Sequence, residues 1–208
     1  MNIWSRFFGR KSAVPRSGYE NWLINLPLDS GDDRTMDDYP ALRKVPYEYE
    51  NSSQECLEKC EHEITIQPDA DLPYTWAANC LKAQGRIHDA EEILRRGICD
   101  ARRKTLLLTD LAKLHHEQKN VIGMVECFVA ATRTQRQNLI DHDPYLYIAY
   151  IAYGCSDNTL EPTATRAKQI AQSMGYDFEP GFANSLMQLA NTKRGDVAKI
   201  LQYTEWPK

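Results

Sequence analysis

Small and apolar residues recur through the middle of the chain at spacings typical of paired amphipathic helices. Between positions 74 and 97, the residues that follow this spacing are Tyr74, Ala77, Ala78, Leu81, Ala90, Leu94 and Gly97. Thirty-four positions later, without insertion or deletion, stand Leu108, Leu111, Ala112, His115, Met124, Phe128 and Ala131. Residues three, four and seven apart share one face of an α-helix, so the pattern predicts two similar helical hairpins.

Each predicted hairpin has turn-forming residues between its two helices. Gln84-Gly85 lies at the first turn and Gln118-Lys119-Asn120 at the second, where a residue that tolerates positive φ is useful. A single hairpin cannot bury both of its apolar faces, so at least three hairpins are expected to stack. The alternative is an ordinary antiparallel bundle whose hairpins are similar in length.

This arrangement resembles the tetratricopeptide repeat (TPR), a unit of 34 residues that reads W-x2-L-G-x2-Y, then A-x3-F, then P. The match is one of size and pattern, because the first Trp, the Gly and the Tyr are replaced here. The resemblance implies an all-α, right-handed stack of antiparallel helical hairpins that holds a peptide or protein in its concave surface. On this chain, that surface would be lined by Tyr74, Ala77, Leu81, Gln84, Leu108, Leu111, His115 and Gln118.

The family also has a carboxylate clamp, which uses Lys and Asn on these faces to hold a peptide C-terminus. Ala77, Leu81 and Leu111 stand there instead, so the binding of a chaperone tail is not supported. An apolar and aromatic surface is better suited to a helix, an apolar segment or the protein's own N-terminal arm.

The flanking segments predict further helices. One runs from a serine cap at residue 52 to Pro68, in register as the second half of an earlier repeat. Asp143-Pro144 begins a helix that is apolar nearly all round and is therefore expected to be central, and the 34-residue register is lost there. A partner helix at 163–174 and a last hairpin with its turn at 193–195 follow.

The chain is expected to divide into two parts. Residues 1–50 would form an N-terminal arm and an extended acidic segment that pack on a helical-hairpin domain of residues 51–208. Residues 26–72 hold 13 acidic and 4 basic side chains, whereas residues 82–136 hold 11 basic and 7 acidic ones. The acidic segment is thus expected to face either the basic repeats of its own chain or a basic partner, unless both are simply solvated faces of mixed sign. The acidic residues expected to contact a partner are Asp32, Asp33, Asp37, Asp38, Glu48 and Glu50.

Candidate chemistry is sparse. The sequence has no Walker loop, GxGxxG, GxSxG or HExxH motif. Cys56 and Cys60 share a helix face, but His62 projects elsewhere, so buried structural thiols are preferred to a metal site. The run Asp141-His142-Asp143 offers ligands for a cation or a catalytic base, although helix capping already explains its last residue. Neither catalysis, a metal nor a cofactor is expected; an enzyme or metal protein that uses one of these groups is the alternative hypothesis.

Composition limits the class of protein. Hydrophobic residues make up 42% and charged residues 26% of the chain, as in soluble globular proteins. No apolar run reaches the roughly 20 residues that span a bilayer, and no secretory signal is recognised. A pI near 5.8 does not favour nucleic acid. The sequence therefore predicts a non-catalytic, cytoplasmic protein-binding module: an adaptor, a chaperone or an immunity-type inhibitor of a basic enzyme or toxin.

Overall fold

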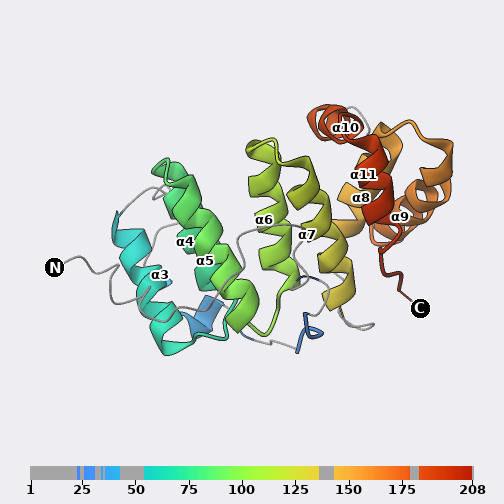
Figure 1. Ribbon diagram of the computed structural model, residues 1–208. Helices are drawn as coiled ribbons and strands as arrows, with labels where there is room; N and C mark the ends of the chain where they lie inside the picture. Colours follow the sequence, from blue (N-terminus) through green and yellow to red (C-terminus); the bar gives the residue numbers. More distant parts are fainter. Residues whose placement is uncertain are drawn as a thin grey trace.

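The computed structural model describes residues 23, 26–30, 34, 36–42, 54–135, 143–178 and 183–207. Within these ranges every regular element is a helix, which confirms the all-α prediction (Figure 1). The predicted arm at residues 1–18 lies outside them. The elements are η1 (Met36–Asp38), α3 (Gln54–Ile66), α4 (Leu72–Ala83), α5 (Ile87–Asp100), α6 (Thr105–Glu117), α7 (Val121–Thr134), α8 (Asp143–Gly154), η3 (Asn158–Leu160), α9 (Glu161–Ser173), α10 (Asn184–Asn191) and α11 (Arg194–Leu201).

The pairs α4–α5 and α6–α7 are the two predicted hairpins. α5 begins at Ile87 and α7 at Val121, 34 residues later, and the ends of the two helices keep the same separation. The turns have positive φ where the sequence predicts it, +73° at Gly85 and +58° at Lys119. The assignment to the TPR family and the right-handed stacking stay predictions, because equal helix spacing does not define a family.

Consecutive helices lie side by side along the molecule. α3 packs on α4, α5 on α6, and α7 on α8, while α4 also contacts α6 directly (Figure 1). The approach is close where α5 crosses its neighbours. A Cβ atom added at Gly97 would lie 2.7 Å from Cγ of Tyr74 and 3.0 Å from Cδ1 of Leu107. Only glycine fits this crossing without movement of α4 or α6.

α8 occupies the centre of the C-terminal part, as its apolar sequence predicts. It packs against α7, α9, α10 and α11. Tyr147 of α8 stacks on Phe128 of α7, with ring centroids 4.6 Å apart. At the other end of α8, a Cβ atom on Gly154 would lie 2.5 Å from Cα of Met187 in α10. α8 therefore joins the two regular hairpins to the last three helices.

Two further details complete the fold. α11 begins at Arg194, so residues 194 and 195, which the sequence assigns to a turn, belong to the helix. Their neighbours Thr192 and Lys193 make the turn, through backbone hydrogen bonds to Leu189 and Ala190. In the described part of the chain, no helix has the length and apolar character needed to cross a membrane.

Candidate functional site

Most residues predicted to line a concave binding surface are buried. Gln84 is half-buried and Gln118 is exposed, but the other six belong to the core. The exposed fraction is 3% or less for each of these six: Tyr74, Ala77, Leu81, Leu108, Leu111 and His115. The apolar stripe that identifies each helix is also the stripe that packs on its neighbours, so it does not remain available for a partner. A partner would have to contact the next face round each helix.

That next face is polar and half-buried. We define the α4/α6/α8 face by the partly exposed side chains that these three helices present. It consists of Thr75, Asn79 and Lys82 of α4, Asp110, Lys113 and Glu117 of α6, and Asp143, Leu146 and Tyr147 of α8.

Ion pairs link the helices of this face. Nζ of Lys82 in α4 lies 2.6 Å from Oε1 of Glu117 in α6. Nζ of Lys113 in α6 lies 3.5 Å from Oδ2 of Asp143 in α8, and 5.6 Å from the ring centroid of Tyr147. The first helices of successive hairpins are thus tied together by side chains of opposite charge. Asp143, a member of the predicted Asp141-His142-Asp143 group, is used in this contact, and residues 141 and 142 lie outside the described ranges.

Asp110 differs from the other carboxylates of the face. Its Oδ2 atom is shielded from solvent and makes no hydrogen bond of ordinary geometry with the described residues, although the Thr75 hydroxyl lies close enough to lower the pKa of Asp110. Burial raises the pKa of Asp110 above its usual value, and the nearby Lys113 ammonium opposes that shift. Buried polar atoms in folded proteins are nearly always paired, so an unpaired carboxylate oxygen marks a place where a donor fits.

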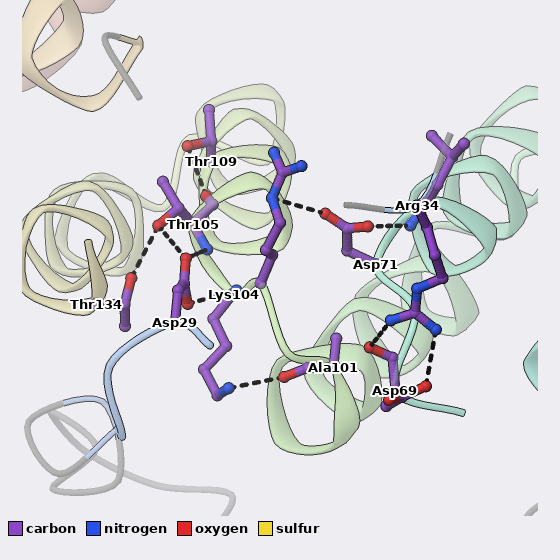
Figure 2. Close-up of polar contacts among 11 residues, drawn as sticks. Asp29, Arg34, Asp69, Asp71, Ala101, Lys104, Thr105, Thr109 and Thr134 are labelled. Carbon is purple, nitrogen blue, oxygen red and sulfur yellow. Dashed lines mark hydrogen bonds and ion pairs between the residues drawn. The ribbon is translucent and has the colours of Figure 1, made fainter. Parts of the chain in front are cut away.

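The acidic N-terminal segment binds its own chain through Asp29. The carboxylate of Asp29 accepts hydrogen bonds from the backbone N–H of Lys104, at 2.8 Å, and from the hydroxyl of Thr105, at 2.8 Å (Figure 2). The backbone N–H of Asp29 donates to the carbonyl of Thr134, at 2.7 Å. A residue distant in sequence therefore caps the N-terminus of α6, where an anion is favourable.

A second set of contacts surrounds Asp69, in the loop between α3 and α4. Its carboxylate lies 2.8 Å from Nη1 of Arg34 (Figure 2). It also lies 2.6 Å from Nε of Arg102. The hydrogen bond from Arg34 is the main reason why the pKa of Asp69 is lowered. Close by, the backbone N–H of Ala41 donates to Oε1 of Glu63, at 2.7 Å.

The described part of the acidic segment follows the first of the two alternatives, in which the segment contacts its own chain. Asp29, Arg34 and Ala41 contact the helical part of the same chain, while Asp37 and Asp38 are exposed. The other predicted partner contacts, Asp32, Asp33, Glu48 and Glu50, lie outside the described ranges.

The candidate metal group in the structure differs from the one that the sequence suggests. The third side chain beside Cys56 and Cys60 of α3 is Cys80 of α4, and His62 is exposed and does not belong to the group. Hydrogen bonds from Cys60 and then Cys80 lower the pKa of the Cys56 thiol, while the hydrogen bonds of Cys60 with Cys56 and then Cys80 raise the pKa of the Cys60 thiol. All six cysteines lie within the described ranges, and none forms a disulfide.

Comparisons with known proteins add no relative. No protein-family model, no curated protein and no solved structure matches this chain.

The sequence pattern did not identify Asp110, Lys113 or Cys80 as site residues. The first two were detectable as a polar stripe at i and i+3 beside the apolar stripe of α6. Cys80 gave no such signal, because its proximity to Cys56 depends on how α3 packs on α4.

Proposed function

We propose that this chain is a non-catalytic protein-binding module that holds a basic segment of a partner protein on the α4/α6/α8 face. The observation that carries the proposal is the buried carboxylate oxygen of Asp110, which makes no hydrogen bond of ordinary geometry in the described part of the chain, although the Thr75 hydroxyl lies near it. A guanidinium or ammonium group of a partner would supply the donor, in a charge-assisted hydrogen bond.

The charges of the face support a basic ligand. Lys82 and Lys113 are opposed by Asp110, Glu117 and Asp143, so the face carries one more acidic than basic group. Both lysines also have carboxylate neighbours, at 2.6 and 3.5 Å. An incoming cation meets a net negative surface, which favours association with a basic segment and disfavours an acidic one.

The helical architecture supports the same function. The described chain consists of packed helical hairpins, and α4 and α6 are the first helices of the two that share the 34-residue spacing. In the TPR family, which the sequence resembles, the first helices line the surface that binds peptides. The proposed function includes an adaptor, a chaperone or an immunity-type inhibitor of a basic enzyme or toxin, and a cytoplasmic location stays a prediction.

The test compares two carboxylate variants of the full chain. Immobilised wild type, Asp110→Asn and Asp196→Asn are exposed to an array of synthetic peptides that differ in Arg and Lys content, and to extract from the native cell. Asp196 is an exposed acid on α11 and serves as the matched control. A hydrogen bond to a charged group contributes about 1.5–3 kcal/mol, so Asp110→Asn should weaken capture of basic ligands about tenfold or more.

Two results would contradict the proposal. One is equal capture of basic peptides by Asp110→Asn and wild type, and the other is a lack of preference for basic over acidic peptides. Because burial raises the pKa of Asp110, the Asn variant should fold at least as stably as wild type near neutral pH. A loss of binding is therefore not a loss of fold, and a urea titration of each variant verifies this.

A further inference from the structure

Three cysteine sulfurs meet where α3 packs on α4. Cys56 and Cys60 lie one turn apart on the same face of α3, and Cys80 faces them from α4. The three Sγ atoms all lie within 4.8 Å of one another, and the Cys56 and Cys80 sulfurs are 2.9 Å apart. Each of the three residues has an exposed fraction of 1% or less. Cys80 shares α4 with the α4/α6/α8 face, but its sulfur meets those of α3 and none of the three cysteines belongs to that face, so the inference does not rest on the proposed binding function.

The spacing of the sulfurs suits a metal ion better than simple packing. Single buried cysteines behave as small apolar residues, but three that converge on one point form a ligand set. Metal–sulfur bonds of about 2.3 Å in a planar three-sulfur site place the sulfurs about 4.0 Å apart. The separations of the present sulfurs, from 2.9 Å to at most 4.8 Å, bracket this value. Rotation of the side chains would therefore be enough to centre an ion.

The number and kind of ligands select the ion. Thiolates prefer soft cations such as Cu(I), whereas structural zinc sites are almost always completed by a fourth ligand. Among the described residues, no further Cys, His, Asp or Glu joins Cys56, Cys60 and Cys80. The surrounding core is apolar: Leu57, Ile64 and Ala77 are buried beside the three cysteines in α3 and α4.

We propose that Cys56, Cys60 and Cys80 bind one Cu(I) ion in a three-sulfur site between α3 and α4. As three copper–sulfur bonds form, the protons of the thiols leave to the solvent, and neither copper nor sulfur changes oxidation state. Cys56 lies in the first turn of α3, and helix ends fray in general, so the ion would enter from this end. The ion would join α3 to α4 and so stabilise the N-terminal helices against unfolding.

The experiment titrates the reduced full chain with Cu(I) under argon, in competition with the chromogenic Cu(I) chelator bicinchoninate. We expect one Cu(I) per chain, ultraviolet absorption from sulfur-to-copper charge transfer, and a higher melting temperature. Loss of a residue that only hydrogen-bonds to a metal ligand already lowers metal affinity roughly 10- to 100-fold. Replacement of a ligand in Cys56→Ser, Cys60→Ser or Cys80→Ser should therefore lower the affinity by at least that factor. Cys155→Ser, which removes a buried thiol of the C-terminal part, should leave it unchanged.

Several outcomes would overturn the copper site. They are the absence of competition with the chelator, equal affinity in the three ligand variants and Cys155→Ser, and stoichiometric zinc with no uptake of Cu(I). Formation of a Cys56–Cys80 disulfide, found by mass spectrometry of a chain that binds no copper when reduced, would do the same. X-ray absorption of the copper-loaded wild type counts the sulfur neighbours directly, so the test holds even if a variant fails to fold.

Discussion

The two regular hairpins, α4 to α7, and the C-terminal helices, α8 to α11, are held together by different contacts. The hairpins rely on small residues that let helices cross closely, as at Gly97, and on polar contacts with the N-terminal segment. The C-terminal helices rely more on aromatic rings. Tyr150 of α8 stacks on Phe178 at 4.8 Å, and Tyr145 stacks on Trp206 at 6.1 Å.

The aromatic contacts, more than the close crossings, mark the region where the 34-residue spacing is lost. Close crossings occur in both regions, at Gly97 and at Gly154. An aromatic side chain extends further and can meet a ring on a loop or a terminus, as Phe178 and Trp206 do. A region built in this way accepts connections of unequal length.

The close crossings are the most sensitive points of both regions. Gly154→Ala would place a Cβ atom 2.5 Å from the backbone of Met187, and we expect a destabilisation of about 3 kcal/mol. Gly97→Ala meets the side chains of Tyr74 and Leu107 at 2.7 and 3.0 Å, and should cost about 2 kcal/mol. Urea unfolding measures both free energies.

Gly195→Ala is the control for these substitutions. Gly195 lies in α11, and no atom approaches within 4 Å of the Cβ position. Alanine should stabilise the protein by about 0.5–1 kcal/mol there, because it lowers the entropy of the unfolded chain. Equal effects of all three substitutions would mean that the crossings are looser than described.

The polar contacts of the hairpin region are tested by Asp29→Ala. The variant leaves the backbone N–H of Lys104 and the hydroxyl of Thr105 without their acceptor at the start of α6. We expect a loss of about 2 kcal/mol, at the upper end of the range for a lost helix cap. Ser30→Ala, next along the chain, is the control, because the bond from Ser30 to Arg102 uses its backbone. A change below the error of denaturant titration would show that α6 does not need the cap.

The aromatic contacts of the C-terminal region are tested by Trp206→Ala. This ring stacks on Tyr145 and lies beneath the guanidinium of Arg166, whose Cζ atom is 4.9 Å from the ring centroid. Its loss should cost about 1.5 kcal/mol. Tyr203→Ala removes an aromatic ring that is 53% exposed and should be nearly neutral. If both variants unfold at the same urea concentration, the stacked ring adds nothing to stability.

Two carboxylates that precede the C-terminal helices, Asp69 and Asp110, should change stability with pH in opposite directions, with smaller effects. The pKa of Asp69 is lowered, chiefly by Arg34. Asp69 therefore adds to the free energy of unfolding above the ordinary pKa of about 3.9, and this stabilisation is lost as pH falls through the lowered pKa. Burial raises the pKa of Asp110, so its stabilisation is full below the ordinary pKa and is lost as pH rises through the raised pKa.

Accordingly, Asp69→Asn should destabilise the protein near neutral pH, and Asp110→Asn should stabilise it. Both differences from wild type should shrink in acid. Urea unfolding of the two variants across the acid range measures this, with Asp196→Asn, at an exposed position, as the reference. A difference that stays constant with pH would contradict the assigned direction.

The sequence was most informative where structure is local. Asp143-Pro144 marks the start of α8, and Gly85 and Lys119 mark turns, because capping and positive φ depend on a few neighbouring residues. It was least informative about the site. The stripe that includes Leu81 and Leu111 identifies the helices, but period alone does not tell a face that packs on a neighbour from one that binds a partner.

Contacts between distant segments were also beyond prediction. Charge balance indicated that the acidic segment would meet basic helices or a basic partner. It did not indicate that Asp29 would cap α6 through backbone N–H groups, which leave no mark in the composition. Nor does the sequence show that Cys80 joins Cys56, because the meeting depends on the packing of two helices.

The contact of Asp29 with α6 has a consequence for biosynthesis. Its backbone partner Lys104 is 75 positions further along the chain. At a synthesis rate of about 5–20 residues per second, the ribosome adds Lys104 roughly 4–15 s after Asp29. During this interval Asp29 lacks its hydrogen-bond donors at the start of α6, although Arg34 and Ala41 can already bind Asp69 and Glu63. Attachment of Asp29 thus marks a polypeptide that has been extended past the start of α6.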